Sequence, residues 1–176
     1  ARPDELMTQE AFESATYADK NMGIVGAGTG ATVAKALGPE SIMKSGLGQA
    51  SIKKGDLVVS AIVGLNAFGD IFDYHKGKQI AGPIKDGKML RTMDYIDKIL
   101  GSFADIKPSN TTIGAVATNA TFNKTELTKI AGMCHDGYAR SINPVHTMFD
   151  GDTIFSLSTN KIEADINLVG TLAAEV

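Results

Sequence analysis

The chain has 176 residues, of which 43% are hydrophobic and 21% are charged, and this composition is typical of one globular domain with a hydrophobic core. A net charge of -3, without long runs of Lys or Arg, excludes an electrostatic surface for nucleic acid or for an anionic membrane. The single cysteine and the absence of an eighteen-residue apolar stretch predict no disulfide, no membrane span and a cytoplasmic location.

The two ends of the sequence predict a fragment of a longer protein. The chain begins with Ala1 and not with Met, and the segment from Ile166 to Val176 has the pattern of a helix that stops before any capping signal. We therefore expect one partial domain spanning residues 1–176.

The first hundred residues predict a helix, a hairpin and a short second helix. An amphipathic pattern covers about the first seventeen residues and is broken by the glycine-rich segment from Gly23 to Gly30. The elements expected after this break are a hairpin from Ser51 to Val63 that turns at Lys54 and Gly55, a strand over 67–74, a loop or edge hairpin over 74–88, a helix over 92–100 and a linker over 101–110.

The remaining residues predict two strands, each followed by a helix. Residues 111–118 form the clearest strand pattern, and Asn123 followed by Glu126 is a capping box that starts a helix. Residues 152–159 alternate as a further strand before the final helix. This order indicates an α+β fold with helices packed on a mostly antiparallel sheet.

Thr111 is the first candidate nucleophile because it lies where a polar linker meets a strand. A threonine hydroxyl needs a base, and a free α-amine on the same residue can serve, with an ordinary pKa of about 7.7–8.0. Such an amine requires cleavage after Asn110. The alternative is that the Thr111-Thr112 pair only starts a β-branched strand.

The glycine-rich segment from Gly26 to Gly30 allows two interpretations. Its pattern is that of a phosphate-binding loop entering a helix that carries Lys35, which would suit a nucleotide. The alternative is a turn in which glycines allow two backbones to approach closely.

Polar residues elsewhere are also ambiguous. Asn66 interrupts an apolar strand and either caps a turn or donates to an oxyanion. Asp150 and Asp152 flank a glycine close to His146 and could bind a cation or form a solvated turn. We interpret Cys134 as a core residue, because its neighbour His135 would point elsewhere on a helix.

Taken together in this order and spacing, these segments resemble the L-aminopeptidase/D-esterase family, which includes the β-peptidyl aminopeptidases and the nylon-oligomer hydrolase. The resembling segments are Gly26–Ala31, Lys35, Gly55–Leu57, Val63–Gly69, Asn110–Ile113, Val116–Asn119, Ala131–Arg140, Pro144–Thr147 and Asp150–Thr153. The resemblance implies an N-terminal-nucleophile hydrolase with a four-layer αββα sandwich. It also implies a precursor that cuts itself into two associated pieces.

The resemblance assigns roles to matching residues. Thr111 matches the nucleophile and Asn66 the amide of the oxyanion hole, while Lys35, Asp150 and Asp152 match residues near the nucleophile.

The resemblance also places the cleavage site between Asn110 and Thr111. Residues 1–110 would then be the C-terminal part of the longer α piece, and residues 111–176 the β piece. Family members have a further N-terminal segment that supplies strands and part of the pocket, so we expect that segment to be a partner of this chain.

The predicted activity is a self-processing aminopeptidase or amidase that hydrolyses small peptides, amino-acid amides or oligoamides as a homo-oligomer, without cofactor or metal. Two alternatives stay open. One is a nucleotide- or phosphate-binding module that uses Gly26–Gly30, and the other is an uncleaved, inactive family member. Cleavage between Asn110 and Thr111 would distinguish the hydrolase from both.

Overall fold

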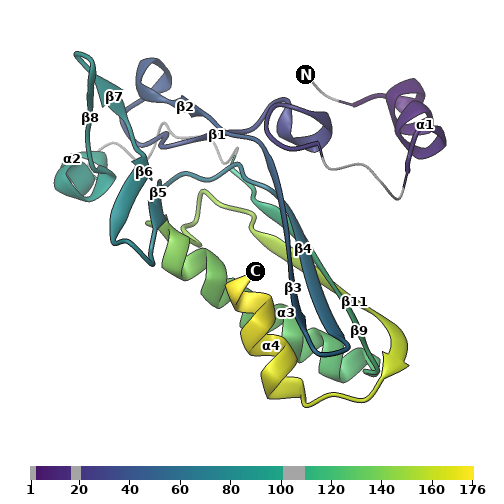
Figure 1. The fold of residues 1–176 in the computed structure, drawn as a ribbon. Coiled ribbons are helices and arrows are strands. Elements are labelled where there is room, and N and C mark those ends of the chain that lie inside the picture. Colours follow the sequence, from purple (N-terminus) through teal and green to yellow (C-terminus); the bar gives the residue numbers. More distant parts are fainter. Residues whose placement is uncertain (1–2, 17–20, 101–109) are drawn as a thin grey trace.

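The computed structural model describes residues 3–16, 21–100 and 110–176, and its described part is built around one four-stranded sheet (Figure 1). The helices are α1 (Glu5–Glu13), α2 (Ile96–Leu100), α3 (Lys124–Ser141) and α4 (Ile166–Glu175), with 3-10 turns η1 (Gly26–Gly28), η2 (Pro39–Ser41) and η3 (Thr92–Tyr95). The strands are β1 (Thr32–Val33), β2 (Met43–Lys44), β3 (Leu47–Lys54), β4 (Leu57–Gly64), β5 (Asp70–Asp73), β6 (Lys78–Ala81), β7 (Ile84–Lys85), β8 (Lys88–Met89), β9 (Ile113–Ala120), β10 (Ile142–Asn143) and β11 (Thr153–Ile162).

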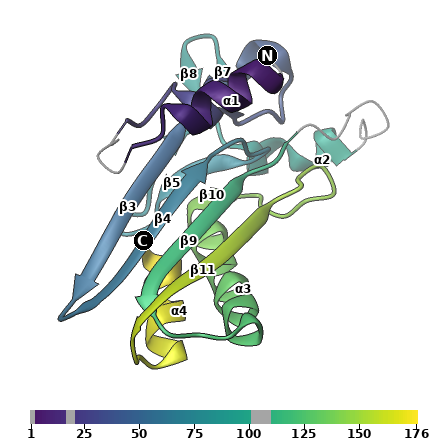
Figure 2. The same ribbon diagram turned by 90° about the vertical axis from the view of Figure 1, so that its right-hand side faces the viewer.

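The main sheet has the strand order β11-β9-β4-β3, in which β11 runs parallel to β9 and the other neighbours are antiparallel. The predicted hairpin is confirmed, since β3 and β4 are joined at Gly55, whose φ of 59° suits a residue without a side chain. Helices α3 and α4 lie behind the sheet in Figure 2 and cover one of its faces. The mostly antiparallel sheet with helices packed on it was predicted correctly.

The two faces of the sheet differ in burial. Along β9, Val116 and Ala120 alternate with residues on the opposite face, and they pack against Ile130 and Cys134 of α3 and Val169 of α4. Full burial of a side chain such as Val or Ile stabilises a fold by about 1.5–3 kcal/mol. The core therefore lies between the sheet and the two helices, and the assignment of Cys134 to this core is confirmed.

Helix α3 begins where the sequence predicts. The Asn123 side chain accepts hydrogen bonds from the backbone of Thr125 and Glu126, and the Glu126 carboxylate accepts one from the Asn123 N–H. This reciprocal capping satisfies backbone donors that a helix start otherwise leaves without partners. Asp165 caps α4 with hydrogen bonds from Asn167 and Leu168.

Two glycines of α3 give a matched test of how closely the helices cross. A Cβ atom on Gly137 would lie 2.6 Å from the carbonyl oxygen of Ala174 in α4, whereas one on Gly132 would meet nothing within 4 Å. We expect Gly137→Ala to lower the free energy of unfolding by about 1–3 kcal/mol through overpacking. Gly132→Ala should raise it by about 0.5–1 kcal/mol through helix propensity. Urea unfolding followed by circular dichroism measures both, and equal stabilisation by the two substitutions would contradict the close crossing.

A smaller sheet, β10-β5-β6, lies at one end of the main sheet. Its buried Asp70 accepts hydrogen bonds from the backbone N–H of Thr92 at 2.7 Å and from the Thr92 hydroxyl at 2.5 Å. Burial raises the pKa of this carboxyl group. The backbone at Gly69 approaches Asn143 and Pro144 so closely that a side chain there would overlap them. These contacts fix the segment between β4 and β5, which carries part of the candidate site.

Three expectations need correction. The first helix is confirmed but is shorter than expected, and the strand predicted over 67–74 covers only Asp70–Asp73. The glycine-rich segment does not enter a helix, because η1 is followed by the short strand β1. The predicted linker over 101–110 lies outside the described residues except for Asn110.

Candidate active site

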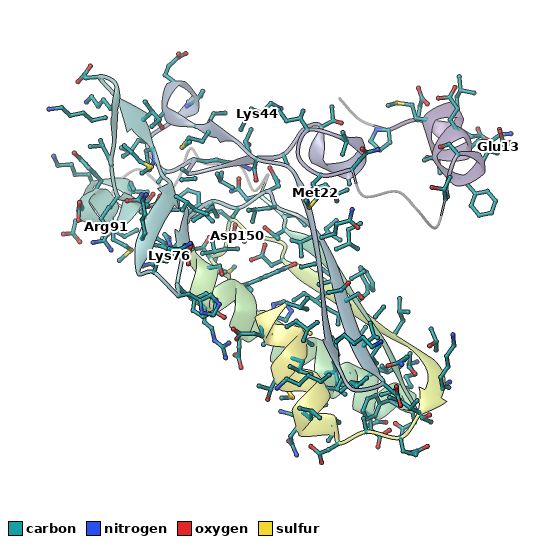
Figure 3. All side chains as sticks on the ribbon, in the orientation of Figure 1. Glu13, Met22, Lys44, Lys76, Arg91 and Asp150 are labelled. Atoms are coloured by element: carbon teal, nitrogen blue, oxygen red, sulfur yellow. The ribbon has the colours of Figure 1, made fainter. Side chains whose placement is uncertain are left out.

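The predicted site residues meet at one end of the main sheet, where β9 and β11 begin. Asp150, labelled in Figure 3, lies at this end, toward the smaller sheet. Asn110 pairs with Asp150 in an isolated parallel bridge just before the two strands. The segments after β1 and β4 bring Lys35 and Asn66 to the same place, so residues far apart in sequence form one polar cluster.

Lys35 fixes the orientation of the Asn66 side chain. The Lys35 Nζ donates to Asn66 Oδ1 at 2.7 Å, and the backbone N–H of Thr32 donates to the same oxygen at 3.2 Å. The backbone N–H of Thr32 can only donate, so the amide oxygen must face it and the NH₂ group is directed elsewhere. The backbone N–H of Asn66 donates to the Thr112 hydroxyl at 3.3 Å, which connects this pair to the start of β9.

The backbone around Lys35 is held in an unusual conformation. Ala34 has a φ of 60°, which is rare for a residue with a side chain, and it is completely buried. The N–H groups of Ala34 and Lys35 donate to the carbonyl oxygens of Gly69 and Phe68 at 3.0 and 2.9 Å. These bonds hold the strained turn that directs Lys35 into the cluster.

Lys35 is half-buried, and burial lowers its pKa to about 8, although the nearby Asp150 carboxylate acts in the opposite direction. The Lys35 amine therefore changes charge close to neutral pH. The expectation that Lys35 lies on a helix is wrong, because it follows the short strand β1.

The Asp150 carboxylate organises the turn before β11. Its Oδ2 accepts hydrogen bonds from the N–H of Thr147 at 3.0 Å and from the Thr147 hydroxyl at 2.6 Å. Its Oδ1 accepts from the N–H of Phe68 at 3.1 Å. Asp150 therefore links this turn to the segment between β4 and β5.

The Asp152 carboxylate connects β9 to a histidine pair. The Asp152 side chain is 3% exposed, its Oδ1 accepts from the Thr112 N–H at 2.9 Å, and its Oδ2 lies 2.9 Å from His146 Nδ1. His146 Nε2 lies 3.2 Å from Nδ1 of His135 on α3. Burial, followed by the influence of His146, lowers the pKa of His135. Asp150 and Asp152 therefore do not form a solvated turn, since both carboxylates accept hydrogen bonds from distant segments.

The peptide bond between Asn110 and Thr111 lies within this cluster. Asn110 is only 3% exposed, so the last residue of the predicted linker is buried. Its carbonyl oxygen accepts a hydrogen bond from the N–H of Gly151 at 2.8 Å. A Cβ atom on Gly151 would lie 2.8 Å from the Thr111 hydroxyl oxygen, so only glycine fits there without displacing it. An open depression of about 510 Å³, lined by His135, His146, Asp150, Gly151 and Asp152, adjoins this position.

Sequence reasoning missed the Gly151 contacts and the link between His135 and His146. The histidines are eleven residues apart on different elements, so no local spacing indicates that they meet. The hydrogen bond between Thr147 and Asp150 joins residues only three positions apart, so local turn chemistry could have predicted it.

One glycine of the glycine-rich segment, Gly28, serves close backbone packing. A Cβ atom on Gly28 would lie 2.3 Å from the backbone nitrogen of Leu47 and 2.4 Å from the carbonyl oxygen of Gly23. The interpretation in which a glycine allows two backbones to approach closely is thus confirmed at Gly28, whereas a Cβ atom on Gly26 or Gly30 would meet nothing within 4 Å. No group of three or more metal-ligating side chains occurs in the part of the chain that the structure describes. Within that part, no helix is long and apolar enough to cross a membrane.

Comparison with solved structures gives the class of fold. The chain is similar to the L-aminopeptidase D-Ala-esterase/amidase of Ochrobactrum anthropi, described as a variant of the Ntn hydrolase fold, with a TM-score of 0.64 at 16% identity over 97% of this chain and 46% of that one. A β-aminopeptidase of a Burkholderia species gives a TM-score of 0.57 at 20% identity over 97% of this chain and 48% of that one. The fold is therefore of the N-terminal-nucleophile hydrolase type, as predicted.

The sequence comparisons identify the family. The model of peptidase family S58 matches residues 2–175, and the chain belongs to that family. It is 37% identical to an uncharacterized aminopeptidase of Mycobacterium leprae over 90% of this chain and 44% of the relative. It is 31% identical to the 6-aminohexanoate-oligomer endohydrolase of an Agromyces species over 92% of this chain and 46% of that enzyme. The resemblance seen in the sequence is confirmed, and the chain spans about half the length of these relatives.

Proposed function

We propose that the protein containing this chain is a self-processing amide hydrolase in which Thr111 becomes both the N-terminus of a β piece and the nucleophile. The observation that carries this proposal is the position of the Asn110-Thr111 bond, which lies inside a cluster of Lys35, Asn66 and two anchored carboxylates. An ordinary strand start needs no such surroundings. Membership of peptidase family S58 supports the same chemistry.

Self-processing begins with attack of the Thr111 hydroxyl oxygen on the carbonyl carbon of Asn110. A C–O bond forms, the C–N bond to Thr111 breaks, and the hydroxyl proton passes to the departing nitrogen. Water then hydrolyses the resulting ester, which leaves a carboxylic acid on Asn110 and a free amine and hydroxyl on Thr111. The overall change is hydrolysis of one peptide bond.

The processed enzyme repeats this chemistry on a substrate amide. The Thr111 α-amine, with an ordinary pKa of about 7.7–8.0, removes the proton from its own hydroxyl as that oxygen attacks the substrate carbonyl. The NH₂ group of Asn66 donates to the developing oxyanion. At neutral pH the Lys35 amine is mostly charged, and a nearby cation favours the free form of the Thr111 amine.

The substrates we propose are small peptides, amino-acid amides or related oligoamides. The relatives with aminopeptidase and oligomer-endohydrolase names support this class.

A preceding segment of the same protein should complete the pocket. The sheet face that no described helix covers exposes Ile62, Ile113, Phe155 and Leu157 by 43–60%, and we propose that the second half of the αββα sandwich covers it. The homo-oligomer that the sequence predicts would bury further surface of the protein.

Intact mass spectrometry tests the proposed processing. The purified protein, expressed with whatever sequence its gene places before residue 1, should yield one piece that ends at Asn110 and one that begins at Thr111. Release of amine from aminoacyl amides by the same sample tests the proposed activity. A single uncleaved mass without turnover would favour the inactive family member instead.

A further inference from the structure

We propose that the backbone N–H of Gly151 is a catalytic oxyanion donor in the self-cleavage reaction. This inference rests on the proposed function, because it concerns the same bond. It assigns a role to Gly151, the glycine that lies between Asp150 and Asp152 in the turn before β11. Two independent contacts of Gly151 carry it.

The first contact is with the carbonyl group that Thr111 attacks. The N–H of Gly151 donates to the carbonyl oxygen of Asn110 at 2.8 Å. During attack, this oxygen gains negative charge while its position changes little, so a donor already at hydrogen-bond distance interacts more strongly as the charge develops. The N–H therefore stabilises the tetrahedral intermediate more than it stabilises the intact peptide bond.

The second contact is with the attacking atom. A Cβ atom on Gly151 would lie 2.8 Å from the Thr111 Oγ1 atom and 3.7 Å from its Cβ and Cγ2 atoms. A side chain at position 151 would therefore overlap the Thr111 hydroxyl, and the glycine leaves that space to the nucleophile. The same residue donates to the oxygen that Thr111 attacks, so both reacting groups lie beside one backbone segment.

The turn is held from both sides. Asp150 is tied to Thr147 and Phe68, and Asp152 is tied to Thr112 and His146. A donor fixed in this way does not need to reorganise when charge develops, which is the condition under which such a donor accelerates a reaction. In this interpretation Asp150 and Asp152 are positioning residues, and the group that touches the reacting atoms is the peptide N–H between them.

The neighbouring ladder provides a matched control. The N–H of Thr153 donates to the carbonyl oxygen of Thr112 at 3.0 Å. This bond is the next rung of the same parallel ladder and does not involve the Asn110-Thr111 bond. If the Gly151 bond only extends this parallel ladder, loss of either bond should have a similar effect. If it stabilises the oxyanion, only the Gly151 bond should matter for the rate.

The experiment replaces each N–H with an ester oxygen. Because Cys134 is the chain's one cysteine, a synthetic segment that begins at Cys134 can be ligated to the recombinant preceding part of the full-length protein. One product carries glycolic acid in place of Gly151, and the other carries the hydroxy acid corresponding to threonine at position 153. A ligated all-amide protein is the parent. Self-cleavage starts on refolding, and intact mass measures its rate.

We expect the ester at 151 to slow self-cleavage on the order of 10²-fold relative to the parent, and the ester at 153 to change it little. Gly151→Ala, made from an ordinary gene, should also slow cleavage because it displaces the Thr111 hydroxyl. If the ester at 151 slows cleavage no more than the ester at 153, the Gly151 bond is structural and the inference is overturned. A parent that does not cleave, or a Thr111→Ala protein that does, overturns the proposed function itself.

Discussion

Thr111→Ala should leave one uncleaved chain and abolish turnover. The substitution removes the hydroxyl that attacks the Asn110 carbonyl, and it leaves the described hydrogen bonds of Thr112, Asp150 and Asp152 in place. Loss of the nucleophile in a comparable hydrolase reduces turnover by about 10⁶-fold, so the expected activity lies at the detection limit. Intact mass and aminoacyl-amide hydrolysis measure the two effects.

Thr111→Ser is the matched control, since it retains a hydroxyl at the same position. We expect this variant to cleave after Asn110 and to produce a piece whose N-terminal residue is the introduced serine. Efficient cleavage of purified Thr111→Ala at the same bond would show that an outside protease acts there. Retention of turnover in Thr111→Ala would exclude Thr111 as the nucleophile.

The elements that the sequence predicted correctly have local signals. The start of α3 follows from the capping box at Asn123, and the β3-β4 hairpin follows from Gly55 between two strand patterns. Periodicity within a few residues determines these elements. The mostly antiparallel sheet follows from their order, but the parallel pairing of β9 with β11 requires a crossover through α3 that no short pattern specifies.

The site was only partly predictable because its geometry depends on that pairing. The parallel register places Gly151 beside Asn110 and Asp152 beside Thr112, so the role of each residue depends on one forty positions away. The glycine-rich segment was ambiguous for a different reason. Glycines allow both anion binding and close backbone contact, and only the structure shows that Gly28 packs against Leu47. Family resemblance predicted Lys35 and Asn66 as site residues, while their mutual hydrogen bond came from the fold.

Asn66→Asp should reduce turnover by roughly 10²- to 10³-fold while the protein remains folded. The substitution retains an oxygen that accepts hydrogen bonds from Lys35 Nζ and the Thr32 N–H, so the contacts that hold the side chain persist. It replaces the NH₂ group, the proposed oxyanion donor, with a second acceptor. Asn66→Ala should show a similar loss of turnover with an added loss of stability, since Lys35 and Thr32 would lose their acceptor.

Asn119→Ala provides the control for a purely structural effect. The Asn119 side chain on β9 accepts from the Val58 N–H and donates to the Asp56 carbonyl oxygen, both at 2.8 Å. Its removal should lower the free energy of unfolding and leave the turnover of the folded enzyme nearly unchanged. Steady-state kinetics on processed protein, with urea unfolding of the same samples, separates the two effects. If Asn66→Asp retains parental kcat, Asn66 only anchors Lys35, and the oxyanion donor lies elsewhere.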